Sequence, residues 1–242
     1  MKRTLVLALA AILLASCGPT KHAVHVEMRH PSKSGVNLFG KNISVVYLEN
    51  DNKHGVDFCN SMAEGFASTL EKDYGTGEGS IGIYRMRASE GADYASKDSL
   101  FNLLMDTGSD VVFLMDTVRF GVMSVGGPSK VASPSSPDSS YVSEGYLPFA
   151  MTLYCFDAMD KTETVNAFSD TSVAKPSVYS NGKDDSTNAT LKAWRSLKDE
   201  GWNAGVQMAG AFKGQWKHEM YSILYYDSEK WYDALEKAEQ YD

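Results

Sequence analysis

Hydrophobic and polar positions along the middle of the chain switch between a strand period and a helix period. The run Ile43–Leu48 is apolar, β-branched and short enough for a buried strand. An amphipathic segment follows it, then a second strand over Ile81–Met86, a second helix through Met105, and a third strand over Asp110–Val118. The third run is apolar on both faces, as in a central strand covered on each side. This β-α-β-α-β order predicts one sheet with packed helices, and right-handed crossovers predict parallel strands.

The two helices between these strands have recognisable apolar positions and ends. In the first, an apolar residue recurs every fourth position, which predicts a core stripe: Phe58, Met62, Phe66 and Leu70. In the second, Asp98-Ser99 is the predicted N-cap and Thr107-Gly108-Ser109 ends the helix. The residues of this second helix predicted to face inward are Leu100, Phe101 and Leu104.

Other segments flank this core. Ala23–Met28 alternates in polarity and predicts an edge strand, which Pro31 stops. Phe120–Tyr146 is rich in Gly, Pro and Ser and is predicted to be a mobile surface loop without regular structure, suited to variable contacts. Leu147–Phe156 and Thr162–Val173 predict an antiparallel hairpin.

From Ser186 onward the pattern is helical. Gly201–Phe212 is rich in small residues, which permit two helices to approach closely. A further apolar stripe predicts another helix, and Glu229–Gln240 predicts the last one. The residues of that further stripe are Trp216, Met220, Ile223 and Leu224.

The N-terminus predicts an export signal. Lys2-Arg3 is positively charged, and Leu5–Leu14 is an apolar run that is shorter than the roughly 20 residues needed to span a bilayer. Its end, Leu14-Ala15-Ser16-Cys17, resembles the bacterial lipobox. The resemblance implies that Cys17 becomes the first residue of the mature chain and carries the lipid. The alternative is an ordinary signal peptide that ends at a cysteine by chance.

A lipid on Cys17 would fix the location of the protein. Several acyl chains, at about 0.8 kcal/mol for each buried CH₂, anchor a protein without a transmembrane helix. Gly18 rather than Asp follows Cys17, which by resemblance to sorting rules favours the outer membrane. No acidic run of the kind that some surface lipoproteins carry comes next, so the resemblance implies the periplasmic face, with surface exposure left open.

These patterns together predict an α/β chain, more fully an α+β mixed sheet. It has a β-α-β-α-β core, an antiparallel hairpin and a C-terminal helical extension. The predicted division is a signal peptide (1–16), a lipidated tether with an edge strand (17–41), a sheet domain (42–180) that includes the mobile loop 120–146, and a helical segment (185–242).

Composition and charge exclude some functions. The chain is 43% hydrophobic and 22% charged, which predicts a folded core. Its net charge of −8 becomes −10 once Lys2 and Arg3 leave with the signal peptide. A chain this acidic, without a Lys/Arg cluster, repels phosphate backbones, so nucleic-acid binding is not expected.

Candidate chemistry is sparse, and we predict no catalytic residue, cofactor or metal. His22 and His25 are three residues apart but lack the carboxylates of a zinc set, and no hydrolase elbow occurs. Cys59 and Cys155 would be free to pair in an oxidising compartment. They also suit small buried hydrophobic positions, which we favour because nothing in the sequence brings their Cα atoms within the ~7 Å that a disulfide needs.

Three resemblances add to these patterns. Val26-Glu27, Pro31, the strand Ile43–Leu48 and the aromatic tail resemble an uncharacterised lipoprotein family of Gram-negative gut commensals, in which a sheet domain precedes tetratricopeptide-like helices. The residues of that tail are Trp216, Tyr225-Tyr226, Trp231 and Ala234. The last helix is similar to the first helix of a tetratricopeptide unit, and the alternative is a terminal amphipathic helix docked on the domain.

A more remote resemblance covers the first half of the chain. Thr107-Gly108-Ser109-Asp110-Val111, before a strand, is similar to a step in curli-secretion and peptidoglycan-synthase-activator lipoproteins. It implies an assembly or scaffolding role.

The leading hypothesis is therefore a non-catalytic lipoprotein of the cell envelope that contacts other envelope proteins. One alternative is a hydrolase or transferase acting on envelope glycans, with its site near Glu49–Asn52 and Arg119 at the carboxyl ends of the parallel strands. Another is a ligand-binding module that uses the Phe120–Tyr146 loop.

Overall fold

The computed structural model describes residues 20–75, 81–131, 140–180, 188–225 and 229–239. The chain divides into two compact units. Residues 31–213 form the larger unit, and residues 1–30 join 214–242 in the smaller one. The predicted signal peptide and Cys17 lie outside the described residues.

The larger unit is an α+β domain. Its elements are β2 (Ile43–Leu48), α2 (Lys53–Tyr74), β3 (Gly82–Met86), α3 (Lys97–Thr107), β4 (Val111–Met115), β5 (Arg119–Phe120), β6 (Ser124–Val125), β7 (Ser129–Val131), β8 (Ser140–Asp157), β9 (Val165–Ala174), β10 (Ser177–Ser180), α4 (Ala189–Arg195) and α5 (Leu197–Ala209). The β-α-β-α-β order and the hairpin formed by β8 and β9 confirm the predicted fold class.

The sheet of the larger unit is mixed. β2 pairs in parallel with β3 on one side and with β4 on the other, as right-handed crossovers predict. β8 then pairs antiparallel with β4, and β9 with β8. All residues of β2 and β4 are buried, which confirms that they are central strands.

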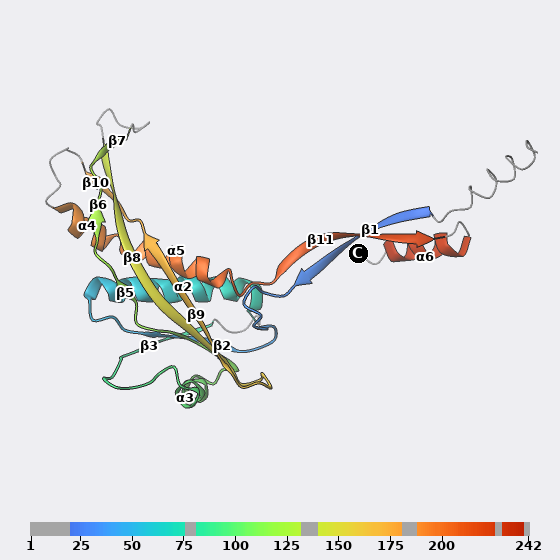
Figure 1. Cartoon of the computed structure of the whole chain (residues 1–242), viewed down its shortest axis with the longest axis horizontal. Coiled ribbons are helices and arrows are strands. Elements are labelled where there is room, and N and C mark those ends of the chain that lie inside the picture. Colours follow the sequence, from blue (N-terminus) through green and yellow to red (C-terminus); the bar gives the residue numbers. More distant parts are fainter. Residues whose placement is uncertain (1–19, 76–80, 132–139, 181–187, 226–228, 240–242) are drawn as a thin grey trace, which may run out of the picture. The chain divides into compact units, whose positions relative to one another are not determined.

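Helices cover the two faces of this sheet. Alternate residues of β2 and β4, such as Val45 and Phe113, pack with the apolar stripe of α2. The residues between them, such as Val46 and Leu114, pack with α3 on the other face. The connection from β3 to β4 passes over β2 in the opposite direction from the first crossover, so the two helices fall on opposite faces. Figure 1 shows α2 and α5 side by side, with α3 across the sheet from them.

The small residues of α5 face α2. A β-carbon on Gly201 would lie 2.4 Å from the carbonyl oxygen of Phe58, and one on Gly65 of α2 would lie 2.4 Å from that of Trp202. Such distances allow only glycine. The predicted close approach of helices through this segment is confirmed.

The start of α3 differs from the prediction. Its N-cap is Ser96, whose hydroxyl accepts a hydrogen bond from the Ser99 backbone N–H at 3.3 Å, so the cap proposed at Asp98-Ser99 is wrong. Leu100 and Leu104 are buried as predicted, but Phe101 is 46% exposed. Phe101 directly follows Leu100 along the helix, so its side chain lies at the edge of the inward-facing stripe and is exposed to solvent.

The segment Phe120–Tyr146 is not a structureless loop in its described part. β5, β6 and β7 each pair with β8, and β8 itself begins at Ser140. Residues 132–139 lie outside the described residues. Gly and Pro suggested irregular backbone here, but β8 is eighteen residues long and offers a ladder along which short strands pair.

The smaller unit is a two-stranded antiparallel ribbon with a helix. β1 (Thr20–His30) pairs with β11 (Gln215–Tyr225) over its whole length, and α6 (Glu229–Glu239) follows. A strand was predicted at Ala23–Met28, but as an edge of the main sheet; it is longer and pairs with β11 instead.

The helix predicted from the stripe at Trp216, Met220, Ile223 and Leu224 is wrong, because this segment is β11. The predicted helical segment 185–242 is therefore interrupted between α5 and α6. A spacing of four residues returns to the same face in a helix and also in a strand, whose period is two. The partner strand β1 decides between the two readings.

Candidate functional site

The polar residues proposed as a catalytic edge have structural partners. Glu49 follows β2, and its carboxylate accepts a hydrogen bond from Arg87 at 3.2 Å and lies 3.8 Å from the guanidinium of Arg85. Arg85 belongs to β3 and Arg87 follows its last residue, and β3 lies beside β2 in the sheet. Glu49 therefore ties two neighbouring strands together at their carboxyl ends.

Asn50 and Asn52 hold the connection into α2. The side-chain amide of Asn50 donates to the carbonyl of Val118 at 2.7 Å, and its oxygen accepts from the Asn52 backbone N–H at 2.9 Å. Asn52 is the N-cap of α2 and accepts from the His54 N–H at 3.0 Å. The structure thus brings residues 49–52 next to Val118, and the side chains of Glu49, Asn50 and Asn52 all serve the fold.

Arg119 is the first residue of β5. Its side chain lines a shallow groove over β5, β8 and β9, together with Pro148 and Val173. A glycan-acting site at Arg119 would have to lie in this groove. None of the described residues that line the groove carries a carboxylate.

Cys59 and Cys155 are free and buried, which confirms the interpretation that they fill core positions. Burial raises the pKa of the Cys59 thiol to about 12, against a smaller lowering by a backbone hydrogen bond with Val118. Burial also raises the pKa of Cys155 to about 12, with a further raising effect of Asp157. Both thiols are therefore protonated at neutral pH, so neither is an activated nucleophile.

The two histidines near the N-terminus do not share a face. His22 and His25 lie in β1, opposite Ile223 and Met220 of β11. Because successive side chains of a strand alternate, residues three apart point to opposite faces. Within the described ranges, no three His, Cys, Asp or Glu side chains gather closely enough to hold a metal ion.

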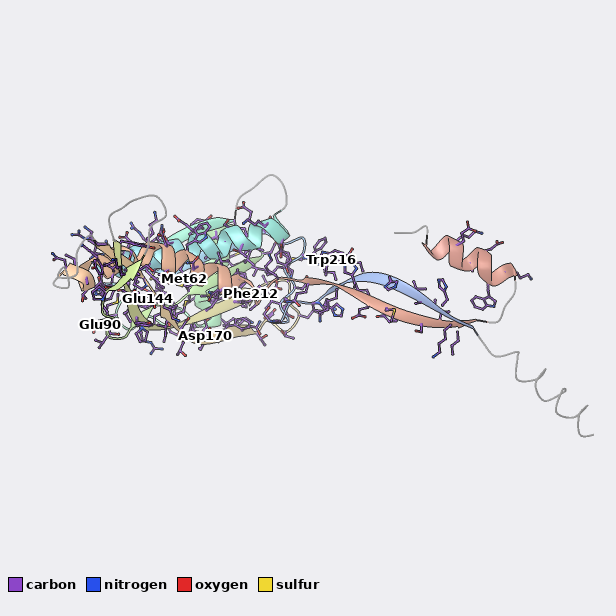
Figure 2. All side chains as sticks on the ribbon, turned by 90° about the horizontal axis from the view of Figure 1, so that it is seen from above. Met62, Glu90, Glu144, Asp170, Phe212 and Trp216 are labelled. Carbon is purple, nitrogen blue, oxygen red and sulfur yellow. The ribbon has the colours of Figure 1, made fainter. Side chains whose placement is uncertain are left out.

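The most distinctive surface is one face of the β1–β11 ribbon. Trp216, Met220 and Leu224 are spaced four residues apart on β11 and share this face. They are 63%, 65% and 58% exposed. Figure 2 labels Trp216 close to the start of β11. We call these three side chains the Trp216 row.

The other face of the ribbon is also apolar and only half covered. Met28 and Val26 of β1 and Tyr221 and Ile223 of β11 alternate with the Trp216 row and are 37–46% exposed. A two-stranded ribbon has no second layer of its own, so both faces meet solvent unless another molecule covers them.

The ribbon also has two long edges. In the described part of the chain, β1 and β11 pair only with each other, so the outer edge of each eleven-residue strand presents backbone N–H and C=O groups without a strand partner. Exposed edges of this length favour pairing with a further strand.

Polar pairs across the ribbon set its register. His30 and Glu219 lie 2.8 Å apart on one face, and His218 and Glu27 lie 3.5 Å apart on the other. The pKa of Glu219 is lowered, first by a hydrogen bond from the Tyr221 hydroxyl. The His218–Glu27 pair is exposed, so it specifies alignment more than it stabilises the ribbon, whereas the His30–Glu219 pair is partly buried.

The predicted lipid attachment site, Cys17, is not among the described residues. None of the helices that the structure describes is both long and apolar enough to cross a membrane.

The sequence contained the signal for this ribbon. β1 alternates visibly, and β11 combines Trp, Tyr and Ile, which favour strands. What the sequence could not provide is the pairing of two segments that lie at opposite ends of the chain.

Comparison with known proteins gives no family for this chain. No protein-family model matches it, and no curated protein matches it. It is similar to a solved structure described as a neuraminyllactose-binding hemagglutinin homolog from Helicobacter pylori, at 12% identity over 87% of this chain and 98% of that one, with a TM-score of 0.33.

Two further structures have lower scores. One is described as a lipoprotein from Caulobacter crescentus (10% identity, 70% of this chain, 88% of that one, TM-score 0.27). The other is a hypothetical protein from Chlamydia trachomatis (12% identity, 70% and 96%, TM-score 0.27). Similarity at this level establishes neither a shared fold nor a shared function.

Proposed function

We propose that this protein is a lipid-anchored component of the bacterial cell envelope that acts by binding another envelope protein through the β1–β11 ribbon. It is held at the outer membrane by a lipid on Cys17, and its role is contact rather than catalysis. The observation that carries the proposal is the Trp216 row, three large apolar side chains exposed in line on one face of a two-stranded ribbon.

The composition of this row supports a protein partner. Trp and Met are enriched where proteins meet, and Trp often dominates the binding energy. Charged and polar groups on the same face, including His218 and Glu27, surround the apolar side chains. An apolar centre with a polar rim is the usual organisation of a protein interface.

The position of the ribbon in the chain connects it with the anchor. β1 begins at Thr20, three residues after Cys17. Three residues reach at most about 10 Å even when fully extended. A lipid on Cys17 would therefore keep the start of the ribbon near the bilayer surface, where membrane-associated proteins are the available partners.

The anchor is tested by labelling. Cells that express the full chain are given a radiolabelled or alkyne-tagged fatty acid, and the protein is isolated and compared with its Cys17→Ser variant. We expect label in the first and none in the second. Label that persists in Cys17→Ser would show that the lipid is attached elsewhere or that the lipobox interpretation is wrong.

The contact is tested by site-specific crosslinking in intact cells. A photoreactive amino acid replaces Met220 in the full chain, and in a matched control it replaces Met105 of α3, which is equally exposed at 65%. We expect one discrete crosslinked protein from position 220 that is absent from position 105. Substitution of Trp216 and Leu224 by Ser should abolish the crosslink while the chain stays folded.

Each other outcome contradicts the proposal in a distinct way. A crosslinked product of twice the chain mass would make the partner a second copy of this chain. Crosslinks only to lipid would make the Trp216 row a membrane contact. Equal crosslinking from positions 220 and 105 would mean that the row is no specific surface.

A further inference from the structure

The larger unit contains a cavity that no part of the proposed function uses. It lies between α5 and the β8–β9 hairpin and has a volume of about 310 Å³. Phe149, Met151, Leu153 and Phe168 form its sheet side. The opposite side consists of Ala204 and Met208 of α5 and of Ala211 and Phe212, which follow its end.

The cavity follows from how the faces of α5 are used. Gly201, Gly205 and Ala209 recur every fourth residue and lie buried on one face, where the glycines contact the α2 backbone. Ala204 on an adjacent side of α5 and Ala211 just beyond its end line the cavity with the shortest apolar side chains. The backbone contact with α2 fixes the helix at a distance from β9 that these alanines do not fill.

Aromatic packing keeps the cavity preformed. The ring of Phe212 stands edge-to-face against Phe168 and against Phe113, both at centroid distances of 5.0 Å, and against Phe66 at 5.7 Å. Such pairs stabilise a fixed ring orientation. Closing the cavity would require this whole cluster to repack.

The charge at the rim of the cavity is negative and comes from a single side chain. Ser169, Ser172 and Gln207 contribute neutral polar groups, and the carboxylate of Asp170 is the one charged group among the described lining residues. Asp170 is exposed on β9, and Figure 2 labels it on the hairpin. A ligand with an apolar body and a cationic head would complement both parts of this site.

We propose that this cavity binds a small molecule that combines an aromatic or branched aliphatic group with a primary amine. The apolar group occupies the space between Phe168 and Met208, and the ammonium lies beside Asp170 at the rim. The volume is sufficient: an engineered apolar cavity of about 150 Å³ accommodates benzene, and natural ligand sites begin at about 300 Å³.

The charge of the ligand is tested with a matched pair of compounds. 2-Phenylethylamine and 3-phenylpropanoate have similar apolar bodies and opposite charges. Binding to the full chain, carrying Cys17→Ser to avoid lipid and detergent, is followed by ligand-observed NMR. For ligands of this size we expect dissociation constants on the order of 1 mM. The amine should bind about two- to fivefold more tightly, as an exposed carboxylate allows.

The site is tested by three variants. The carboxylate of Asp170 accepts a hydrogen bond from the Thr171 backbone N–H at 2.7 Å. The amide oxygen of Asp170→Asn can accept the same bond, so we expect this variant to fold normally. Without the negative charge it should bind both compounds equally. Ala204→Leu fills the cavity and should weaken binding of the amine at least about tenfold, because the side chain occupies the volume that the ring needs. Asn203→Leu adds the same side chain at an exposed neighbouring position outside the cavity and should leave binding unchanged.

The outcomes separate the parts of the proposal. Equal binding of amine and acid to the parent chain would overturn the role of Asp170 and the cationic ligand class. Unchanged binding in a folded Ala204→Leu would place the ligand elsewhere and overturn the site. Should Ala204→Leu not fold, chemical-shift changes confined to the cavity residues of the parent chain decide the location. None of these results depends on the lipid anchor or on the ribbon.

Discussion

Gly205 of α5 lies against the backbone of α2 at Met62: a β-carbon on Gly205 would come within 2.0 Å of the Met62 carbonyl oxygen and 2.8 Å of the Phe66 nitrogen. Real β-carbons do not approach backbone atoms this closely. Gly201, one turn earlier, has the same relationship with Phe58 at 2.4 Å. The two helices are therefore packed backbone to backbone over consecutive turns.

This packing predicts that Gly205→Ala destabilises the larger unit. The methyl group has no space, so α5 must move away from α2 and lose contacts along its length. Overpacking of this kind costs about 1–3 kcal/mol. The better helix propensity of Ala returns less than about 1 kcal/mol. We expect the midpoint of urea unfolding to fall, with a net loss of about 2 kcal/mol.

Gly127→Ala is the matched control. It makes the same chemical change at an exposed position where a β-carbon would meet nothing within 4 Å. Its free energy of unfolding should stay within about 0.5 kcal/mol of the parent chain, as for most surface substitutions. Equal effects of the two substitutions would contradict the tight packing at Gly205.

The sequence predicts the core of the larger unit well because its signals are local. The apolar run of β4 and the stripe from Phe58 to Leu70 each lie within one short segment of the chain, and all these residues are buried. The small residues of α5 likewise predict a close helix contact. Local propensity and tertiary packing agree here, which is the condition under which sequence reasoning succeeds.

Prediction fails where the partner is distant in sequence. Trp216, Met220 and Leu224 fit a helix and a strand equally well, and the strand forms because β1, almost two hundred residues earlier, pairs with it. The cavity beside Ala204 is missed for a related reason. The alanines are visible in the sequence, but the space beyond them depends on where β9 lies.

The register of the ribbon predicts a crosslink. Ala23 and Ser222 are directly opposite, small and exposed. Opposite residues in an antiparallel pair have Cα atoms about 4.5–5.5 Å apart, within the range of a disulfide. We expect Ala23→Cys combined with Ser222→Cys to form an intramolecular disulfide under mild oxidation, detected as a faster band on a non-reducing gel.

A shifted pair controls for chance contact. Ala23→Cys with His218→Cys places the second thiol four residues out of register, about 13 Å along the strand. This variant should stay reduced. Efficient oxidation of both variants would mean that the ribbon slips, and oxidation of neither would contradict the pairing of β1 with β11.

Lys41 and Asp157 form a buried ion pair that predicts a large effect of substitution. Their side chains are 14% and 8% exposed, and the other Asp157 oxygen accepts from the Met159 backbone N–H at 2.9 Å. Lys41→Met leaves the carboxylate buried without its cation. Removing one partner of a buried pair costs about 3–5 kcal/mol, so we expect a clear loss of stability in urea unfolding.

The exposed pair Lys97–Glu163 is the control for this prediction. Its side chains are 50% and 62% exposed. The nearby Lys97 holds the pKa of Glu163 below its usual range, but water screens the interaction. Lys97→Met should change the midpoint of urea unfolding far less than Lys41→Met does. A loss as large as that of Lys41→Met would show that burial is not what distinguishes the two pairs.

The buried cysteines predict that the protein loses stability in alkali. Cys59 and Cys155 have pKa values of about 12 in the folded state, raised from 9.0 by burial. Between pH 9 and 12 the unfolded chain therefore binds fewer protons than the folded one, and the free energy of unfolding falls as pH rises. Each thiol contributes up to about 1.4 kcal/mol per pH unit in this window and nothing well below pH 9.

Comparison of pH 8 with pH 10 in the parent chain and in the double variant Cys59→Ala/Cys155→Ala isolates this effect, because lysines and tyrosines titrate alike in both chains. Urea unfolding of the parent chain should show a loss of about 1–3 kcal/mol between the two pH values. Cys59→Ala and Cys155→Ala should each lower stability at pH 8, through lost packing, but flatten the pH dependence. In the parent chain at pH 8, thiol reagents should modify Cys59 and Cys155 only after denaturant is added. Rapid modification without denaturant, or an unchanged pH dependence in the double variant, would show that the thiols are not held in the core as described.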